Sequence, residues 1–270
     1  MTLRVPDTLT NDEAKKYVVS IRLWSDGLSF AGYIPSEKSG FFYGEIPFDQ
    51  TKPSLSALQD IFFSNEFFTY DYKQIYVICT GRQYTLTPES IFVEKQKEQL
   101  MAFTFSSPED KILHEPMKEF ASEMLFGIDR EVYEFCSRTL IHPHFIHSMS
   151  PLLTQWRKQN FACFPKQLYI ALHEDTMDAA CFDRGALLFV NSFQCTDHTD
   201  ILYYILYIWK QMGLDQMKDQ LFLSAPPLVY RNLYETLQKY VERIEPLKPQ
   251  WLNAGEETPL DIIALFECEL

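Results

Sequence analysis

The residues best suited to chemistry by type and spacing are the histidines of residues 141–147, IHPHFIH. His142 and His144 are two positions apart, so on a strand both would point to one face, as two ligands of a metal ion can. No cysteine or carboxylate stands near them at ligand spacing. We therefore expect exposed or half-buried polar histidines rather than a metal centre, and the sequence implies no cofactor.

Carboxylates gather around one predicted turn, and they raise the possibility of a nuclease. A nuclease of the ribonuclease H type holds two Mg²⁺ ions with carboxylates on its central strands. The segments that would supply those strands, residues 17–24 and 74–80, carry none. We therefore expect a solvated acidic turn, and a metal-dependent nuclease is the third of three functions that we weigh. The acidic residues are Glu174, Asp175, Asp178 and Asp183.

The cysteines show no chemistry of their own. They form no CxxC pair, and most lie inside apolar segments, as is typical of buried, reduced thiols in a cytoplasmic protein. No HExxH, GxSxG or GxxxxGK[ST] motif occurs, and only 9 of the 270 residues are glycine, which argues against glycine-rich phosphate loops. The six cysteines are Cys79, Cys136, Cys163, Cys181, Cys195 and Cys268.

Charge and hydropathy limit the partners. The formal net charge of −13 argues against a surface that follows the phosphates of a nucleic acid. The longest apolar run, residues 201–209, is far shorter than the roughly 20 residues that a membrane helix needs. The N-terminal residues lack the apolar core of a signal peptide. We expect a cytoplasmic protein with no membrane span and no nucleic-acid partner.

The elements that would position these residues follow one order in the first half of the chain. A turn signal, Ser25-Asp26-Gly27, separates the first two strands. A helix begins near Ser54, and Thr87-Pro88 predicts the start of another, because proline favours the first helical position. The predicted strands are residues 17–24, 28–34, 41–48 and 74–80.

The second half repeats the same β-β-β-α-β-α order. Residues 74–80 (QIYVICT) fall on residues 220–226 (QLFLSAP) at an offset near 146, and both are short apolar runs typical of strands buried on two faces. A repeat of this length predicts duplicated domains rather than a solenoid. The predicted strands are residues 167–173, 177–183, 186–195 and 220–226, and the helices are 198–212 and 229–241.

Residues 106–165 have no clear counterpart in the second half. Residues 111–126 predict one long strand or two, 129–139 a helix and 141–147 a strand; Ser150-Pro151 and Thr258-Pro259 each open a helix. We expect a first domain over residues 1–165, with 106–165 as its extra segment, and a second domain over residues 166–270.

Two β-β-β-α-β-α units in tandem resemble the actin-like ATPase superfamily, which includes sugar kinases, heat-shock ATPases and pilus and type II secretion assembly proteins. The resemblance implies an α/β fold, a tandem duplication of a ribonuclease-H-like unit. The chain as a whole resembles an uncharacterised bacterial family of that superfamily, one with no established activity.

In active members the first hairpin of each half binds phosphate through an Asp-x-Gly pattern and a small hydroxyl residue. Here Gly27 and Ser29 match, but Ser25 holds the Asp position, and Asp26 is one residue off and would point to the other face. The second hairpin, Glu174-Asp175-Thr176, has no glycine. Ala225-Pro226-Pro227 stands where the adenosine motif needs paired glycines.

An actin-like fold would place Asp26 opposite Glu174 and Asp175. Each of these carboxylates would cost a triphosphate about 1 kcal/mol in water-like surroundings. We therefore expect no binding of Mg-ATP. The leading hypothesis is a non-catalytic actin-like scaffold that binds a cytoplasmic protein partner, and the alternative is a divergent nucleotide-binding ATPase or phosphotransferase. Most aromatic residues stand at strand or helix periodicity, and we expect them in the core. Those at 41–43, 62–63 and 67–70 exceed what one face can bury, so an interface is the alternative for part of them.

Overall fold

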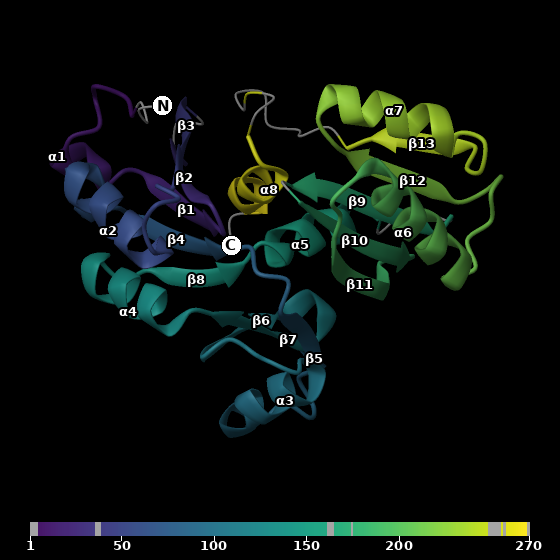
Figure 1. Ribbon diagram of the computed structural model, residues 1–270, viewed down its shortest axis with the longest axis horizontal. Helices are drawn as coiled ribbons and strands as arrows, with labels where there is room; N and C mark the ends of the chain where they lie inside the picture. The colour runs from purple at the N-terminus through teal and green to yellow at the C-terminus, as the bar shows by residue number, and fades with distance from the viewer. Residues whose placement is uncertain are drawn as a thin grey trace. The chain divides into compact units, whose positions relative to one another are not determined.

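The computed structural model describes residues 5–35, 39–160, 165–173, 175–247, 255 and 258–268. The chain divides into two compact units. The first consists of residues 1–150 and 253–258, and the second of residues 151–252 and 259–270. Each unit is built around its own five-stranded sheet (Figure 1). Within the part of the chain that the structure describes, no helix has the length and apolar character to cross a membrane.

The sheet of the first unit has the order β3-β2-β1-β4-β8. β1, β2 and β3 form an antiparallel meander, and β4 and β8 continue the sheet parallel to β1. Its strands are β1 (Val18–Trp24), β2 (Gly27–Ile34), β3 (Ser39–Pro47), β4 (Gln74–Cys79) and β8 (His144–His147).

One face of this sheet carries the main apolar core of the unit. Val19 and Ile21 of β1 pack there, together with residues of α1 (Asn11–Ala14), α2 (Ser54–Ser64) and α4 (Arg130–Thr139). Ser20 and Arg22 alternate with them and lie on the opposite face, also buried. β4 is buried over nearly its whole length, as its apolar sequence predicted.

Most of the aromatic excess belongs to this core. Phe42, Phe62 and Phe68 are buried, and Phe30 lies 5.2 Å from Phe42 and 4.9 Å from Phe68 between ring centroids. The expectation of core packing is therefore confirmed for Phe42, Phe62 and Phe68, and the alternative of an interface does not apply to them. Phe63, at 80% exposure, is the member of the group that faces solvent.

A second, three-stranded antiparallel sheet is inserted in the first unit between β4 and α4. Its order is β5-β7-β6, formed by β5 (Tyr84–Pro88), β6 (Lys111–Met117) and β7 (Ser122–Ile128). α3 (Lys97–Thr104) packs on it through Met101, which joins Ile112 and Leu125 in a small core.

This inserted sheet corrects two sequence-based predictions. Thr87-Pro88 does not start a helix: both residues end β5 and pair with β7. Proline suits the end of an edge strand as well as a helix start, since its missing N–H is not needed in either place. The segment without a counterpart is residues 84–128 rather than 106–165, because α4 and β8 match elements of the second unit.

The second unit repeats the topology with the order β11-β10-β9-β12-β13. β9, β10 and β11 are antiparallel, and β12 and β13 run parallel to β9. β12 thus occupies the position of β4, as the offset near 146 predicted. The strands are β9 (Gln167–His173), β10 (Thr176–Asp183), β11 (Ala186–Gln194), β12 (Gln220–Ser224) and β13 (Arg243–Pro246).

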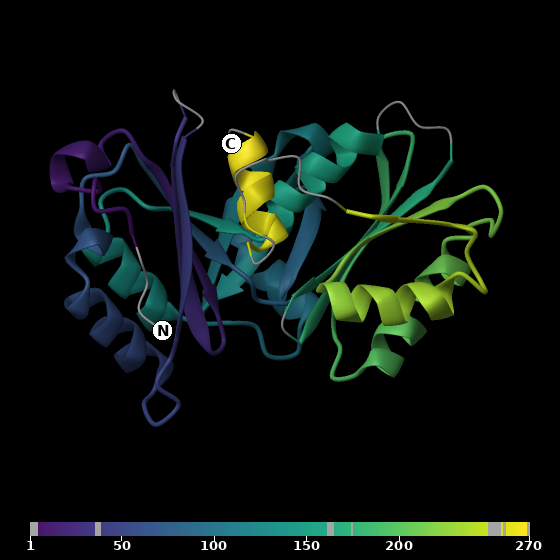
Figure 2. The ribbon, with the colours of Figure 1, turned by 90° about the horizontal axis from the view of Figure 1, so that it is seen from above.

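Helices cover both faces of this second sheet. α6 (His198–Gln211) and α7 (Pro227–Leu237) lie along one face, where Ile205 and Leu233 are fully buried in the core (Figure 2). On the other face, Trp156 of α5 (Met149–Asn160) stacks on Tyr169 of β9 at 5.4 Å. α8 (Leu260–Cys268) is joined to α5 by a hydrogen bond from Gln155 to Glu267.

Candidate functional site

The two hairpins that bind phosphate in active members of the superfamily are paired and anchored in the same way here. Trp24 pairs with Gly27 across one two-residue loop, and His173 pairs with Thr176 across the other. The Asp26 carbonyl oxygen accepts a hydrogen bond from the N–H of Phe48 at 2.7 Å, and the Asp175 carbonyl oxygen accepts one from the N–H of Cys195 at 2.8 Å. Each hairpin is therefore tied to the chain that follows the third strand of its sheet.

In the first hairpin, Gly27 is required by the packing of Trp24. A Cβ atom at Gly27 would lie 2.6 Å from the indole carbon Cζ2 of Trp24 and 2.8 Å from the carbonyl oxygen of Ile46. The indole therefore fills the space that this glycine leaves open. The guanidinium carbon of buried Arg22 lies 5.7 Å from the indole centroid and adds a cation–π contact.

The other residues of the first hairpin do not form a phosphate site either. Ser25, which stands at the Asp position of the superfamily pattern, is exposed, as is Asp26. Ser29, which matches the pattern in sequence, is fully buried within β2. Its hydroxyl is therefore shielded from solvent.

In the second hairpin, neighbouring side chains donate hydrogen bonds to the acidic residue Asp175. Asp175 is exposed, but Thr176 Oγ1 donates to its Oδ1 at 3.3 Å and Gln194 Nε2 donates to its Oδ2 at 3.2 Å. Glu174 lies outside the described residues, and the placement of Asp26 opposite Glu174 and Asp175 stays a prediction.

The end of β12, where the superfamily carries paired glycines, has few donors. Pro226 precedes α7 and Pro227 is its first residue, and no side chain caps the helix. A helix N-terminus binds anions through its free N–H groups, and a proline has none. Two successive prolines therefore remove two donors from the end of α7, while Ala225 packs on the core.

His142 and His144, the weak candidates for metal ligands, do not share a strand face. His142 lies before β8 with a left-handed φ of 50°, whereas His144 is the first residue of β8 and lies 6.0 Å from Tyr76 between ring centroids. Pro143 between them accounts for the break in the strand. No group of three or more histidine, cysteine or acidic side chains suited to a metal ion occurs within the described ranges.

One member of the acidic group is buried rather than solvated, which corrects the expectation for that residue. Asp178 is 4% exposed, its Oδ2 lies 3.3 Å from Nε2 of His173, and Ser192 Oγ donates to its Oδ1 at 2.5 Å. A buried carboxylate of this kind is stabilised by partners on both oxygens. Asp178 therefore has a hydroxyl donor on one oxygen and the His173 ring beside the other.

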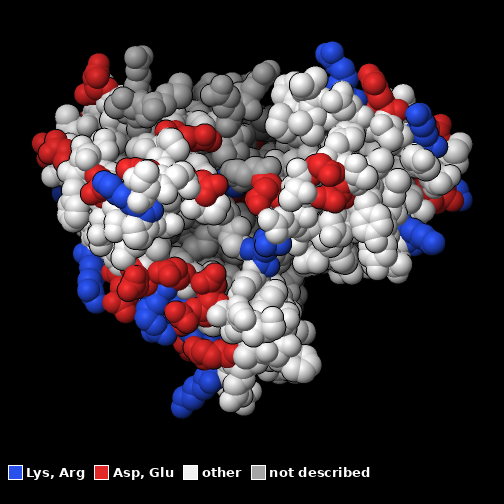
Figure 3. All heavy atoms as spheres, in the orientation of Figure 1, with Lys and Arg blue, Asp and Glu red and all other residues white. Residues whose placement is uncertain are grey.

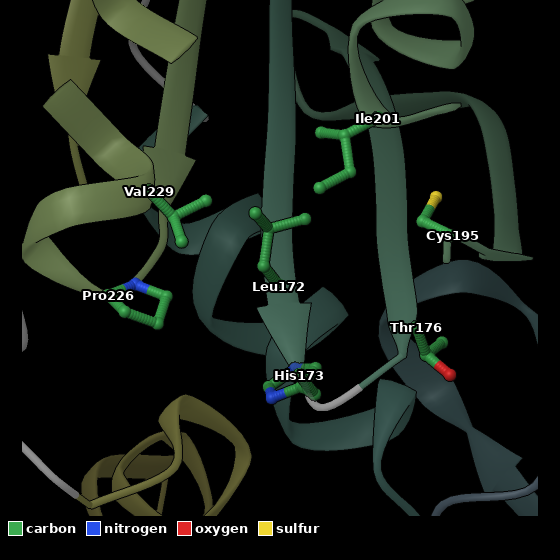
Figure 4. A pocket seen from close by; sticks show the side chains of 7 residues that line it. All are labelled: Leu172, His173, Thr176, Cys195, Ile201, Pro226 and Val229. Carbon is green, nitrogen blue, oxygen red and sulfur yellow. The ribbon is translucent and has the colours of Figure 1, made fainter. Parts of the chain in front are cut away.

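A small pocket of about 120 Å³ lies beside the second hairpin. Figure 4 shows Leu172 in its centre, with Val229 on one side and Ile201 on the other. Burial, with nearby carboxylates, raises the pKa of the Cys195 thiol in this pocket to about 11. The thiol is thus protonated at neutral pH and is not an activated nucleophile. The remaining lining residues are His173, Thr176 and Pro226.

A larger pocket of about 520 Å³ lies beside the first hairpin, and no sequence pattern pointed to it. Its rim carries three carboxylates. Glu109 comes from the loop between α3 and β6, and Asp129 and Glu131 come from the start of α4. Its apolar wall combines side chains of β1, α2 and α4. The lining residues are Leu23, Trp24, Ser25, Phe48, Pro53, Ser54, Leu55, Leu58, Glu109, Asp129, Glu131 and Val132.

A buried polar network joins the inserted sheet to the main sheet of the first unit. Glu115 of β6 accepts hydrogen bonds from the N–H of His147, at 2.8 Å, and from Ser150 Oγ. His147 is 1% exposed; its Nδ1 accepts from the N–H of Met149, so its Nε2 carries the proton donated to the carbonyl oxygen of Gly81. Burial raises the pKa of Glu115 to about 7. Because Ser150 bonds Glu115 and not His147, the three residues do not form a nucleophilic triad.

Comparison with known proteins gives a family and a fold. A family model described as a protein of unknown function (DUF3822) matches residues 6–244. None of the curated protein sequences matches the chain.

Two solved structures resemble the chain over most of its length. A Bacteroides thetaiotaomicron protein with actin-like ATPase fold and unknown function is 27% identical, with a TM-score of 0.85 over 97% of this chain and 99% of that one. A chain of a PilM–PilN type IV pilus biogenesis complex is 10% identical, with a TM-score of 0.56 over 92% of this chain and 96% of that one. The predicted actin-like ATPase fold is confirmed.

Proposed function

The chain belongs to the DUF3822 family of proteins of unknown function, and on that premise we propose that it is a non-catalytic actin-like protein that binds a protein partner in the cytoplasm. The observation that carries this proposal is the Trp24 indole, which fills the open side of Gly27 in the one hairpin that retains the glycine. A phosphate cannot approach the backbone on a side that an aromatic ring already occupies.

Two further features support the absence of nucleotide chemistry. The second hairpin has Thr176 where the first has Gly27, and its acidic residue Asp175 already bonds Thr176 and Gln194. Pro226 and Pro227 remove backbone donors where an adenosine motif is expected. The same fold occurs in a protein–protein complex of pilus biogenesis, so partner binding is compatible with it.

The cytoplasmic part of the proposal rests on the cysteines. Five of the six lie in the described residues and all five are free; four of these are buried. Buried reduced thiols are typical of proteins in a reducing compartment.

Calorimetry and thermal unfolding with Mg-ATP and Mg-ADP test the proposal. We expect no heat of binding at millimolar nucleotide, no shift in unfolding and no ATPase activity above buffer. A bound nucleotide at 100 times its Kd would add about 2.7 kcal/mol to the free energy of unfolding. The control is the triple variant Asp26→Ala, Glu174→Ala, Asp175→Ala. Saturable binding that this variant loses would favour the alternative, a divergent ATPase or phosphotransferase.

A further inference from the structure

We propose that the 520 Å³ pocket of the first unit is the docking site for a partner segment in which a lysine or arginine lies beside an apolar side chain. The inference rests on the proposed function, since it assigns the partner's chemistry and the surface that receives it. Three properties of the pocket lead to this occupant.

The first property is the charge of the rim. Glu109, Asp129 and Glu131 line the pocket, and its described lining includes no lysine or arginine. Figure 3 shows acidic side chains gathered on the surface around α4, with some Lys and Arg side chains among them. Of the rim residues, Asp129 caps this helix and Glu131 lies in its first turn. A lysine or arginine placed among these carboxylates gains electrostatic energy, and the net charge of −13 steers a basic segment toward the protein from a distance.

The second property is the apolar wall. Leu58 is 1% exposed and belongs to the core, and Leu23, Phe48 and Val132 are half-buried side chains packed against that core. An apolar side chain that enters the pocket would extend this packing and leave water, which is favourable in proportion to the apolar area buried. A free metal ion or a small amine would not use this wall.

The third property is the start of α2. Pro53 precedes the helix and no side chain caps it, so the partially positive end of α2 is presented at the pocket through Ser54 and Leu55. The carbonyl oxygens of an extended segment are suited to this end. By contrast, Asp129 caps α4 by accepting from the N–H of Val132 at 2.9 Å. A peptide is the ligand that combines a cation, an apolar group and backbone acceptors.

Other occupants fit less well. A nucleotide or another polyanion would meet three carboxylates, each of which repels it. The 120 Å³ pocket of the second unit is too small for a peptide side chain with its backbone, and no acidic residue lines it in the described chain.

Peptide selection against the intact protein tests the proposal. A displayed library of random 12-residue peptides is selected on the full chain, and the enriched peptides are synthesised and measured by calorimetry. We expect a consensus with lysine or arginine within three positions of a leucine, isoleucine or phenylalanine. We also expect binding to weaken several-fold between 0.05 and 0.5 M NaCl, because salt screens exposed charges.

Paired charge reversals localise the binding. The double variant Glu109→Lys, Glu131→Lys should weaken the selected peptides at least tenfold. The matched control Glu89→Lys, Glu98→Lys changes the same charge at exposed residues outside the pocket and should change affinity less than threefold. A peptide with its basic residue changed to glutamate should bind the pocket variant better than it binds the unchanged protein.

The results that would overturn the proposal are distinct from those that would overturn the proposed function. Failure to enrich peptides, an acidic or uncharged consensus, or equal binding by both double variants would refute the docking site. If Mg-ATP then also fails to bind, the non-catalytic proposal is unaffected. Saturable Mg-ATP binding would refute the non-catalytic proposal whatever the peptides do.

Discussion

The same place in the two units holds two different pockets. Both lie where the hairpin of the first two strands meets the start of a helix, and both hairpins are tied to the third strand's end through the carbonyl oxygen of Asp26 or Asp175. The first pocket measures about 520 Å³ with a carboxylate rim, and the second about 120 Å³ with no carboxylate among its described lining residues. The repeated topology thus sets the position of a pocket, while side chains and one insertion set its size and charge.

The difference has local causes. In the second unit, Ile201, Val229 and Pro226 line the smaller pocket, and Asp197 caps α6 by accepting from the N–H groups of Thr199 and Asp200. In the first unit, α2 has no such cap, and Glu109 is contributed by the chain between α3 and β6 of the inserted sheet. We therefore expect binding specificity to come from features that differ between the two units, such as the uncapped start of α2 and Glu109.

The largest expected effect on the free energy of unfolding comes from Glu115, whose buried network joins the inserted sheet to the main sheet of the first unit. The described part of the second unit has no counterpart of this inserted sheet. Burial raises the pKa of Glu115 to about 7, above its ordinary value of 4.5, so the folded protein binds the proton more tightly than the unfolded chain does. Its contribution to stability is full below pH 4.5 and is lost as pH rises through 7, a change of about 3 kcal/mol.

The variant Glu115→Gln keeps the shape of the protonated acid and cannot ionise. We expect it to match the unchanged protein near pH 4.5 and to exceed it by about 3 kcal/mol above pH 8, measured as the free energy of unfolding in urea at several pH values. A constant difference between the two proteins across that range would show that Glu115 does not titrate in the folded state.

The next largest change in the free energy of unfolding is expected from exchanging equivalent residues between the two hairpins. Gly27→Thr places in the first hairpin the residue that the second has at the equivalent position, and its Cβ would meet the Trp24 ring and the Ile46 carbonyl oxygen. We expect a loss of about 2–3 kcal/mol. The reciprocal Thr176→Gly should cost about 1 kcal/mol or less. Similar losses from the two substitutions in urea unfolding would mean that the hairpins are packed alike.

The smallest expected change in the free energy of unfolding shows whether Asp129, at the first pocket, stabilises α4 through its capping oxygen or through its charge. Asp129→Ala removes the cap of α4 and should cost about 1 kcal/mol, as should Asp197→Ala at the cap of α6. Asp129→Asn keeps a capping oxygen and should cost less than about 0.5 kcal/mol in the same unfolding assay. If Asp129→Asn destabilises as much as Asp129→Ala, then the charge, and not the cap, is what α4 requires.

Sequence patterns predicted the parts of the fold that depend on local periodicity. The apolar runs of residues 74–80 and 220–226 marked β4 and β12, because a strand covered on both faces has no polar alternation. The prediction of a helix start at Thr87-Pro88 was wrong, because proline occurs both at strand ends and at helix starts. The residue that pairs with Pro88, Ser122, is distant in sequence and gave no local signal. The Glu115 network is equally non-local, with partners at 147 and 150.

Part of the site was within reach of the sequence and part was not. In a hairpin with a two-residue loop, Trp24 and Gly27 stand opposite each other. A tryptophan opposite a glycine indicates that its ring lies over the glycine on the neighbouring strand. The large pocket carried no such signal, because Glu109 and Glu131 come from segments that meet only in the folded chain.

The place where the inserted sheet joins the first unit has an evolutionary consequence. The chain leaves the main sheet after β4 and returns before α4, and the two crossings are adjacent: the N–H of Gly127 donates to the carbonyl oxygen of Gln83 at 3.1 Å. Segments whose ends lie side by side can be gained, lost or exchanged without rewiring the strands around them. Residues 84–128, which include Glu109 of the large pocket, therefore form a segment that can change without altering the strand order of the main sheet.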